Sequence, residues 1–228
     1  MLSNIINTTL QPHSTPENFN EYEYDITDEL TSNYYTAVAI DEYNSIYTTH
    51  NPDGTSILTK FNQHGDTIYT IDISKPLSEL SIINEIIPDL NGNIYLVGVI
   101  FRLFTPQAAI YKYTTDGKLL WRRYKETNDD GRFIRATYTN NRIYAIGYLP
   151  SKQDSESEIT YIAAYTSTGK LITSTTKSIQ NDTSKQAIYD IKHDKHGNIY
   201  IAGSIENPSN NQIEAYITKL SPSLKPLS

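Results

Sequence analysis

The sequence predicts an all-β protein assembled from four repeats of short strands. A turn followed by alternating β-branched and aromatic residues recurs four times, a pattern typical of a hairpin turn that leads into a half-buried strand. The tyrosines shared by these stretches are Tyr47, Tyr95, Tyr144 and Tyr200. They recur about every 50 residues, a period typical of propeller blades rather than of helical repeats. Because no segment keeps a 3.6-residue apolar period, we expect little helix.

The first 20 residues are rich in Pro, Ser and Asn and show no sustained period. We therefore expect a flexible tail over residues 1–20. The repeats run through the rest of the chain, which predicts one propeller domain over residues 21–228.

Each repeat divides into four strands, a to d in chain order. In the second repeat we expect strand a at Ile83–Ile87, strand b from Asn93 to about Ile100, strand c at Ala109–Thr114 and strand d at Leu119–Tyr124. Glycine lies in the turn between strands c and d of the first three repeats, where a tight hairpin needs positive φ. The same order fits residues 35–73, 133–176 and 187–220.

The fourth repeat ends after strand c, because the residues that follow include Pro222 and Pro226. Residues 22–26 read Tyr-Glu-Tyr-Asp-Ile and precede the first strand a by about nine residues, as strand d does in other repeats. We expect this N-terminal strand to complete the last blade and close a propeller of four blades, each of four antiparallel strands. The alternative is that a second chain or a larger host completes a bigger ring.

Two repeats contain the pattern Asp-x-x-Gly-Asn-Ile-Tyr-x-x-Gly, at residues 89–98 and 194–203. With the stretch from Ile110 to Trp121, they resemble the bacterial SBBP-type β-propeller repeat family. The resemblance covers residues from about 21 to 228 and is looser in the first and third repeats. It implies a propeller fold and a tendency to bind other molecules, and it implies no reaction.

Composition excludes several classes of function. The net charge of −7 disfavours nucleic acid and anionic membrane surfaces as partners. No apolar run is long enough to span a bilayer, so we expect no membrane insertion. The absence of cysteine excludes disulfides and thiolate chemistry. The N-terminus lacks the features of a secretory signal, which predicts a cytoplasmic start and leaves signal-less export or a removed leader open.

Variable loops mark one face of the predicted propeller. The turns a–b and c–d are short and similar, whereas the b–c and d–a loops vary and share the other face, where function is usually found. In one b–c loop, Phe101 and Phe104 flank Arg102, and aromatic and arginine residues dominate interface hot spots. We expect these three residues to anchor a partner, a protein or a glycan. The alternative is an extended strand b whose side chains fold over the neighbouring blade.

Two carboxylates occupy matching positions of strand a. Glu85 and Asp190 each lie ten residues before the repeated tyrosine, and strand a lines the channel of a propeller. They can face each other across the channel as an acid/base pair or hold a cation. The alternative is a solvated channel wall, since Ala37 occupies the position in the first repeat and the third repeat is ambiguous.

The pattern His193-Asp194-Lys195-His196 offers potential metal ligands, but Asp194 matches the turn-forming Asp89 and no further histidine or cysteine completes a site. We predict no metal and no cofactor, because motifs for calcium loops, phosphate binding and activated nucleophiles are absent from the sequence.

The main functional interpretation is a non-catalytic binding module that uses the variable-loop face. The alternatives are a carbohydrate-active or other hydrolytic propeller with Glu85 and Asp190 in its channel, and a structural subunit of a larger assembly. The sequence names neither the ligand, nor the biological process, nor the oligomeric state.

Overall fold

The computed structural model describes residues 34–52, 55–74, 80–102, 105–125, 131–151, 158–177, 186–206, 210 and 212–227. Over these residues the regular structure is entirely β-strand. A search of the same residues finds no helix with the length and hydrophobicity that a membrane span requires.

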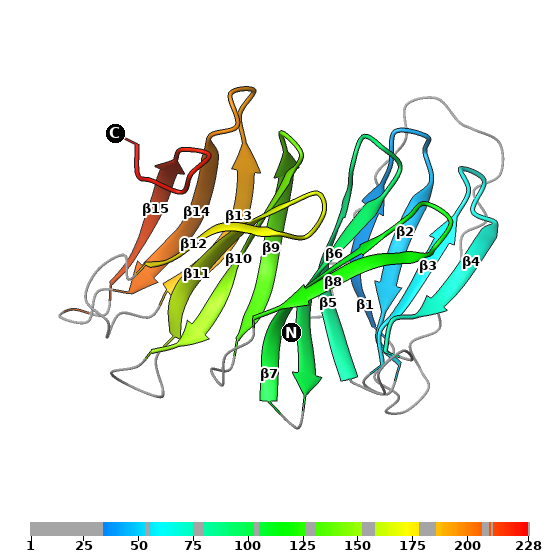
Figure 1. Ribbon diagram of the computed structural model, residues 1–228. Helices are drawn as coiled ribbons and strands as arrows, with labels where there is room; N and C mark the ends of the chain where they lie inside the picture. Colours follow the sequence, from blue (N-terminus) through cyan, green and yellow to red (C-terminus); the bar gives the residue numbers. More distant parts are fainter. Residues whose placement is uncertain are drawn as a thin grey trace, which may run out of the picture. The chain divides into compact units, whose positions relative to one another are not determined.

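The strands form four antiparallel sheets, one for each sequence repeat (Figure 1). The first sheet contains β1 (Tyr35–Ile40), β2 (Ile46–His50), β3 (Ile57–Phe61) and β4 (Thr67–Asp72), and the second contains β5 (Leu80–Pro88), β6 (Ile94–Arg102), β7 (Thr105–Tyr113) and β8 (Leu119–Tyr124). The third contains β9 (Arg132–Thr139), β10 (Arg142–Pro150), β11 (Glu158–Thr166) and β12 (Leu171–Lys177), and the fourth β13 (Gln186–His193), β14 (Ile199–Glu206) and β15 (Ile213–Leu220).

Within every sheet, strands that follow one another in the chain are hydrogen-bonded neighbours. This meander confirms the predicted all-β repeat architecture. The predicted strand d at Leu119–Tyr124 matches β8, but strands b and c are longer than expected. β6 and β7 pair as far as Arg102 opposite Thr105, because the extra residues continue the alternation of the ladder.

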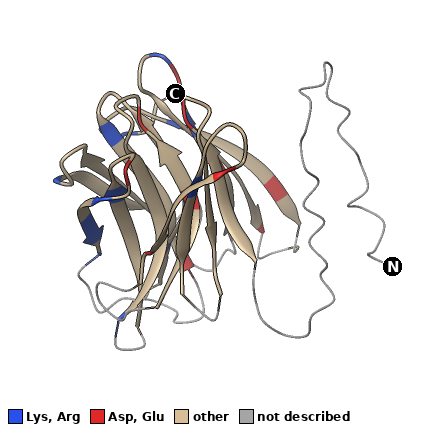
Figure 2. Cartoon of the chain, turned by 90° about the vertical axis from the view of Figure 1, so that its right-hand side faces the viewer, with Lys and Arg blue, Asp and Glu red and all other residues tan. Residues whose placement is uncertain are grey.

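The hydrophobic core lies between neighbouring sheets. Side chains alternate along each strand, so that one set packs on the preceding sheet and the other on the following sheet. Three clusters result, around Tyr47 and Ile83, around Tyr95 and Phe133, and around Tyr144 and Ile199. Figure 2 looks at the first sheet and shows strands that carry few charged residues along their length.

Aspartate organises three of the four turns between the first and second strands. A single carboxylate oxygen of Asp89 accepts hydrogen bonds from the backbone N–H groups of Asn91 and Asn93, both at 2.9 Å. Asp41 and Asp194 make the equivalent pairs of bonds. These are the turn-forming roles that the repeat motif predicts.

The fourth sheet has three strands within the described residues. After β15 the chain turns back at Ser221–Lys225 and bridges Leu220 with Pro226. The segment predicted to complete this sheet, residues 22–26, lies outside the described residues, as does the predicted tail over residues 1–20. Ring closure by that segment therefore stays a prediction.

Candidate active site

A β-bulge interrupts the first strand of every sheet at the same place. The extra residue, which has no partner on the neighbouring strand, is Thr36 in β1, Asn84 in β5, Ile134 in β9 and Tyr189 in β13. These four strands also pack on one another across the sheets, β1 on β5, β5 on β9 and β9 on β13, and so form the inner edge of the array. Bulges bend a strand and re-aim the side chains beside them, and they are common next to active sites.

In the second, third and fourth sheets a glycine lies on the second strand opposite the residue that precedes the bulge, and His50 takes this position in the first sheet. A Cβ on Gly98 would lie 2.0 Å from the carbonyl oxygen of Ile82, and one on Gly147 would lie 1.8 Å from that of Arg132. A Cβ on Gly203 would likewise lie 2.3 Å from the carbonyl oxygen of Ala187, on the first strand of the same sheet. Because any side chain would collide with backbone, the motif glycine marks the bulge in the sequence.

The residues that follow the bulge form a set along the inner edge. They are Ala37, Glu85, Arg135 and Asp190 in sheet order. Glu85 and Asp190 thus have equivalent positions in the strand register, and Arg135 occupies the third position, which was ambiguous in the sequence. An arginine thus lies in the sheet between the two acids.

Sequence reasoning missed Arg135 because the third repeat has a shorter turn. Asn140 and Asn141, both with positive φ, form a two-residue turn between β9 and β10 in place of the longer aspartate turn. This removes one residue between the bulge and the repeated tyrosine, so that counting ten residues back from Tyr144 gives Ile134 instead of Arg135. The pair Asn-Asn, a signal for a tight turn, could have revealed the offset.

Glu85 lies between the second and third sheets. Its carboxylate accepts a hydrogen bond from the backbone N–H of Ala136 on β9. Burial raises the pKa of Glu85, while this hydrogen bond and the charges of Arg135 and Lys192 oppose the rise and the charge of Asp190 adds to it. A carboxyl group with a raised pKa can keep its proton near neutral pH and donate it to a substrate.

Asp190 lies on the inner edge of the fourth sheet and is half exposed. Its carboxylate forms an ion pair with Lys192 at 2.8 Å and accepts the backbone N–H of Ile191 at 2.8 Å. Nearby, Arg135 Nε donates to the carbonyl oxygen of Tyr189 at 3.2 Å, which ties the third sheet to the bulge of the fourth. Glu85, whose pKa is raised by burial, and Asp190, which is paired with Lys192, thus lie in one electrostatic cluster.

The His193-to-His196 stretch has structural roles. Asp194 Oδ1 accepts hydrogen bonds from the turn backbone, and Asp194 Oδ2 accepts one from the side-chain amide of Asn198. These hydrogen bonds, chiefly the one from the Asn198 side chain, hold the pKa of Asp194 well below its ordinary value. His193 Nδ1 lies 2.8 Å from the hydroxyl of Thr137 on β9. Among the described residues, no group of three or more His, Asp or Glu side chains is arranged to hold a metal ion.

The predicted partner anchor does not form a loop as expected. Phe101 and Arg102 belong to β6, where they pair with Pro106 and Thr105, so the extended-strand alternative describes their backbone. The guanidinium of Arg102 lies 4.5 Å from the ring centroid of Tyr124. Phe104 lies outside the described residues. Most of the variable-loop face does too, and partner binding there is neither supported nor excluded by the fold.

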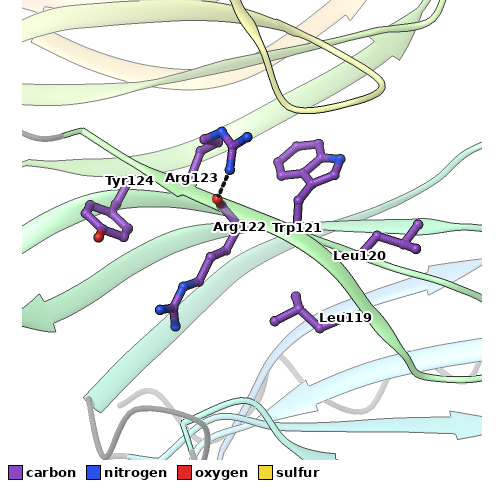
Figure 3. A pocket seen from close by; sticks show the side chains of 6 residues that line it. All are labelled: Leu119, Leu120, Trp121, Arg122, Arg123 and Tyr124. Atoms are coloured by element: carbon purple, nitrogen blue, oxygen red, sulfur yellow. Dashed lines mark hydrogen bonds between the residues drawn. The ribbon is translucent and has the colours of Figure 1, made fainter.

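A cavity of about 540 Å³ runs along β8, lined by Leu119, Leu120, Trp121, Arg122, Arg123 and Tyr124 (Figure 3). β8 is the last strand of the second sheet, separated from β5 by two strands. The residues that line the cavity include no carboxylate, and the indole of Trp121 is bound to the third sheet by a hydrogen bond from Nε1 to Ser167 O at 2.9 Å. It is therefore not the place for the acid/base chemistry.

No family model matches the chain, and no curated protein matches it. The resemblance to SBBP-type repeats accordingly stays a hypothesis. Solved structures do match. An α-L-arabinanase from Penicillium chrysogenum, solved with arabinobiose, aligns with a TM-score of 0.58 at 7% identity, over 85% of this chain and 64% of that chain.

An endo-arabinase from Bacteroides thetaiotaomicron aligns with a TM-score of 0.48 at 8% identity, over 86% of this chain and 77% of that chain. A protein of unknown function from Bacteroides caccae aligns with a TM-score of 0.45 at 11% identity, over 86% and 80%. At 7% identity, the match with the Penicillium arabinanase, a β-propeller, shows a propeller-like fold for this chain, which spans less than two thirds of that protein's length.

The comparisons correct the main functional interpretation. The sequence favoured a non-catalytic binding module, whereas the solved structure that aligns with a TM-score of 0.58 is an arabinanase in complex with arabinobiose. This finding overturns the preference for a non-catalytic module, and the alternative, a hydrolytic propeller with carboxylates in its channel, becomes the proposal.

Proposed function

We propose that this chain is a carbohydrate-active hydrolytic propeller in which Glu85 and Asp190 are the reacting pair. The observation that carries the proposal is their placement: both follow the bulge of an innermost strand, in the second and fourth sheets, and the charge of Asp190 raises the pKa of Glu85. Glycoside hydrolysis uses two such carboxyl groups, one protonated and one ionised, on either side of the scissile bond.

Their environments assign the two roles. Glu85 is the proton donor, because burial raises its pKa. Asp190, which is more exposed and paired with Lys192, is the base. In the proposed reaction Glu85 gives its proton to the glycosidic oxygen as the bond to the anomeric carbon breaks. Water supplies the new hydroxyl group at that carbon, and its second proton goes to Asp190.

Arg135 occupies the same position in the sheet between them and positions the pair. Its guanidinium is held by the carbonyl oxygens of Tyr189 at 3.2 Å and Ile134 at 2.8 Å, so its charge stays on the inner edge beside Glu85. The charge limits how far burial can raise the pKa of Glu85. The arabinanase match supports oligosaccharides of neutral sugars as the first substrates to test.

The test is turnover on a panel of arabino-oligosaccharides and chromogenic glycosides, with reducing ends and released chromophore measured. We expect Glu85→Gln and Asp190→Asn each to lower kcat/KM by about 100-fold or more, the typical contribution of a positioned acid or base. Glu42→Gln makes the same chemical change on an exposed turn residue and is expected to keep full activity. Full activity in Glu85→Gln, or a wild type inactive on every member of the panel, contradicts the proposal.

A further inference from the structure

A lysine–tyrosine pair recurs on the face that each sheet turns to the next, called here the forward face. The lysine lies on the third strand and the tyrosine opposite it on the second strand. In the first sheet Lys60 Nζ lies 5.1 Å from the ring centroid of Tyr47, and in the second sheet Lys112 Nζ lies 4.7 Å from that of Tyr95. All four side chains are buried between sheets.

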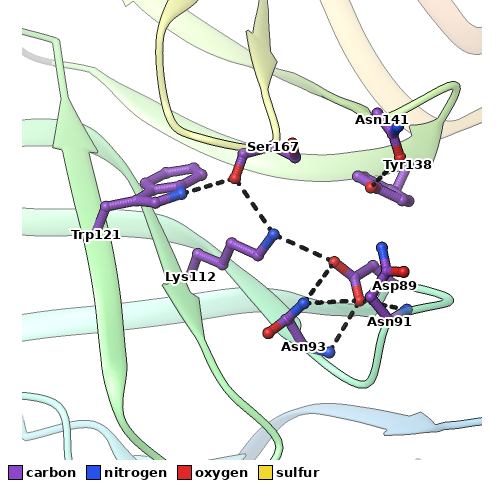
Figure 4. Close-up of polar contacts among 8 residues, drawn as sticks. All are labelled: Asp89, Asn91, Asn93, Lys112, Trp121, Tyr138, Asn141 and Ser167. Carbon is purple, nitrogen blue, oxygen red and sulfur yellow. Dashed lines mark hydrogen bonds and ion pairs between the residues drawn. The ribbon is translucent and has the colours of Figure 1, made fainter.

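Each lysine continues into the next sheet. Lys60 Nζ donates to the carbonyl oxygen of Thr115 at 3.1 Å, and Lys112 Nζ donates to that of Ser167 at 3.3 Å (Figure 4). Both acceptors lie in the turn between the third and fourth strands of the following sheet, two residues before its glycine. Each lysine therefore links its own sheet to the turn of the following sheet by a charge-assisted hydrogen bond.

A side chain from the fourth strand covers the same turn. A Cβ on Gly117 would lie 2.5 Å from Ile71 Cδ1, and a Cβ on Gly169 would lie 2.8 Å from the indole of Trp121. The third sheet has Ala164 where the others have lysine. There the hydroxyl of Tyr144 donates a hydrogen bond to Pro222 O at 3.0 Å. Every contact between described neighbouring sheets thus includes a forward face bound to the next sheet's turn.

The fourth sheet has the same forward face, but among the described residues no further sheet packs against it. Lys219 lies opposite Tyr200, with Nζ 5.3 Å from the ring centroid. Ile217, two residues before Lys219, is 78% exposed, whereas Ile110, two residues before Lys112, is fully buried. Ile213 on the same strand face is also largely exposed.

The first sheet carries the complementary surface, also open. A Cβ on Gly65, the turn glycine of this sheet, would meet no heavy atom of the described residues within 4 Å. On the side of the sheet away from its neighbour, called here the backward face, Val38 and Ile40 are 68% and 62% exposed, and Ile68 is exposed as well. Isolated exposed aliphatic residues are ordinary, but two sheet faces that each carry several of them mark an interaction surface.

We propose that the forward face of the fourth sheet binds the backward face of the first sheet of a second copy of this chain, head to tail. Lys219 would then donate to the carbonyl oxygen of the partner's Gln63, the residue two before the turn glycine. The two faces repeat the halves of a contact that the chain already makes between its own sheets, which is the reason for choosing a second copy as occupant.

The chain's own first sheet does not fill this role in the structure. The first and fourth sheets stand at opposite ends of the described array, and both faces are exposed (Figure 1). Because the two contacting surfaces differ, the association is heterologous, and it adds copies in one direction unless the rotation closes a ring.

The experiment uses the full chain, with molar mass measured across a concentration series by sedimentation velocity. Ile217→Asp blocks the forward face and Val38→Asp blocks the backward face. Leu90→Asp is the matched control, because Leu90 is equally exposed but lies on a turn outside both faces. The wild type and Leu90→Asp are expected to associate beyond monomers. Each face variant alone is expected to self-associate about 100-fold more weakly or not at all, as for a buried interface residue.

Mixing the two face variants gives the sharper result. One keeps only a forward face and the other only a backward face, so an equimolar mixture should form a one-to-one dimer and nothing larger. A wild type that stays monomeric overturns the proposal, and so does unchanged association of Ile217→Asp with a normal melting curve. If the monomeric wild type shows hydrogen exchange at β15 as slow as at β7, another segment of the same chain covers the face, which also overturns it.

Discussion

The second and fourth sheets present the same forward face to different surroundings. Tyr95, Ile110 and Lys112 of the second sheet correspond to Tyr200, Ile217 and Lys219 of the fourth in strand, register and residue type or character. The first set is sealed against the third sheet, whereas Ile217 is open to solvent. Residue type and strand alternation therefore determine which side chains can be buried, and a neighbouring sheet decides whether they are.

The lysine shows how the surroundings change a residue's role. Lys112 is buried because Asp89 lies 3.3 Å from its ammonium group and Ser167 O accepts its hydrogen bond. In the fourth sheet the corresponding aspartate, Asp194, is bound by the hydroxyl of Tyr200 at 3.2 Å. A buried charge requires such partners, whereas an exposed one does not.

The largest difference is expected from shortening the two isoleucines. Ile110→Ala leaves a cavity between sheets and should lower the free energy of unfolding by about 2–5 kcal/mol. Ile217→Ala should change it by less than about 0.5 kcal/mol at concentrations where the protein is monomeric. Urea denaturation of dilute protein measures both. Equal losses would mean that another part of the chain buries the fourth sheet.

Replacing Lys112 and Lys219 with methionine tests whether the ammonium group contributes to stability only where it is buried and paired. Lys112→Met leaves the carboxylate of Asp89 buried with only its turn hydrogen bonds, and we expect a loss of about 2–3 kcal/mol. Lys219→Met should leave the free energy of unfolding nearly unchanged, because solvent screens the charge of Lys219. Thermal and urea unfolding report the change. A harmless Lys112→Met would show that the ion pair with Asp89 contributes nothing to stability.

Gly65 and Gly169 allow a further comparison of an open turn with a covered one, because both glycines have a positive φ. Gly65 and Gly169 have φ of +86° and +82°, so alanine at either position costs about 1–2 kcal/mol. At Gly169 the new methyl group also meets Trp121, which should add about 1 kcal/mol or more. The difference between the two variants in one denaturation series isolates the contact between sheets. No difference would mean that Trp121 moves aside freely.

The smallest effect concerns Glu85, which the third sheet covers. Because burial raises its pKa above the ordinary value of 4.5, protonation stabilises the folded state. The stability of the wild type relative to Glu85→Gln should therefore be greatest below pH 4.5 and should decline as the pH rises through the folded pKa. Denaturation curves of both proteins at a series of pH values measure it. A relative stability that increases with pH would contradict the assigned shift.

Much of the local structure could be predicted from residues that act through their own backbone. The turn aspartates, the turn glycines with positive φ and the alternation in β8 are short-range features, and each lies where the repeats predict it. The ends of β6 and β7 were predicted too short, because Arg102 and Thr105 join the ladder only through pairing with each other. Pairing between strands has no signature in either strand alone.

The candidate site, too, was predicted in part from the sequence, and the rest of it required the structure. Equal distance from the repeated tyrosines was enough to match Glu85 with Asp190, because both repeats have a turn of the same length. Arg135 was not found, since a turn one residue shorter offsets the third repeat, and only the observed bulges restore the correspondence. In three of the four repeats the bulge can be recognised afterwards in the glycine three residues after the repeated tyrosine.

By itself the sequence determined the number of repeats, the strand order within each, the turn chemistry and the two matching carboxylates, because all of these follow from residue type and local periodicity. Only the tertiary structure decided that Glu85 is covered while Asp190 stays half exposed, that Arg135 lies between them, and that Ile110 and Ile217 differ completely in burial. The physical reason is that burial and electrostatic surroundings depend on which sheet packs against which, and that contact joins residues about 50 positions apart in the chain.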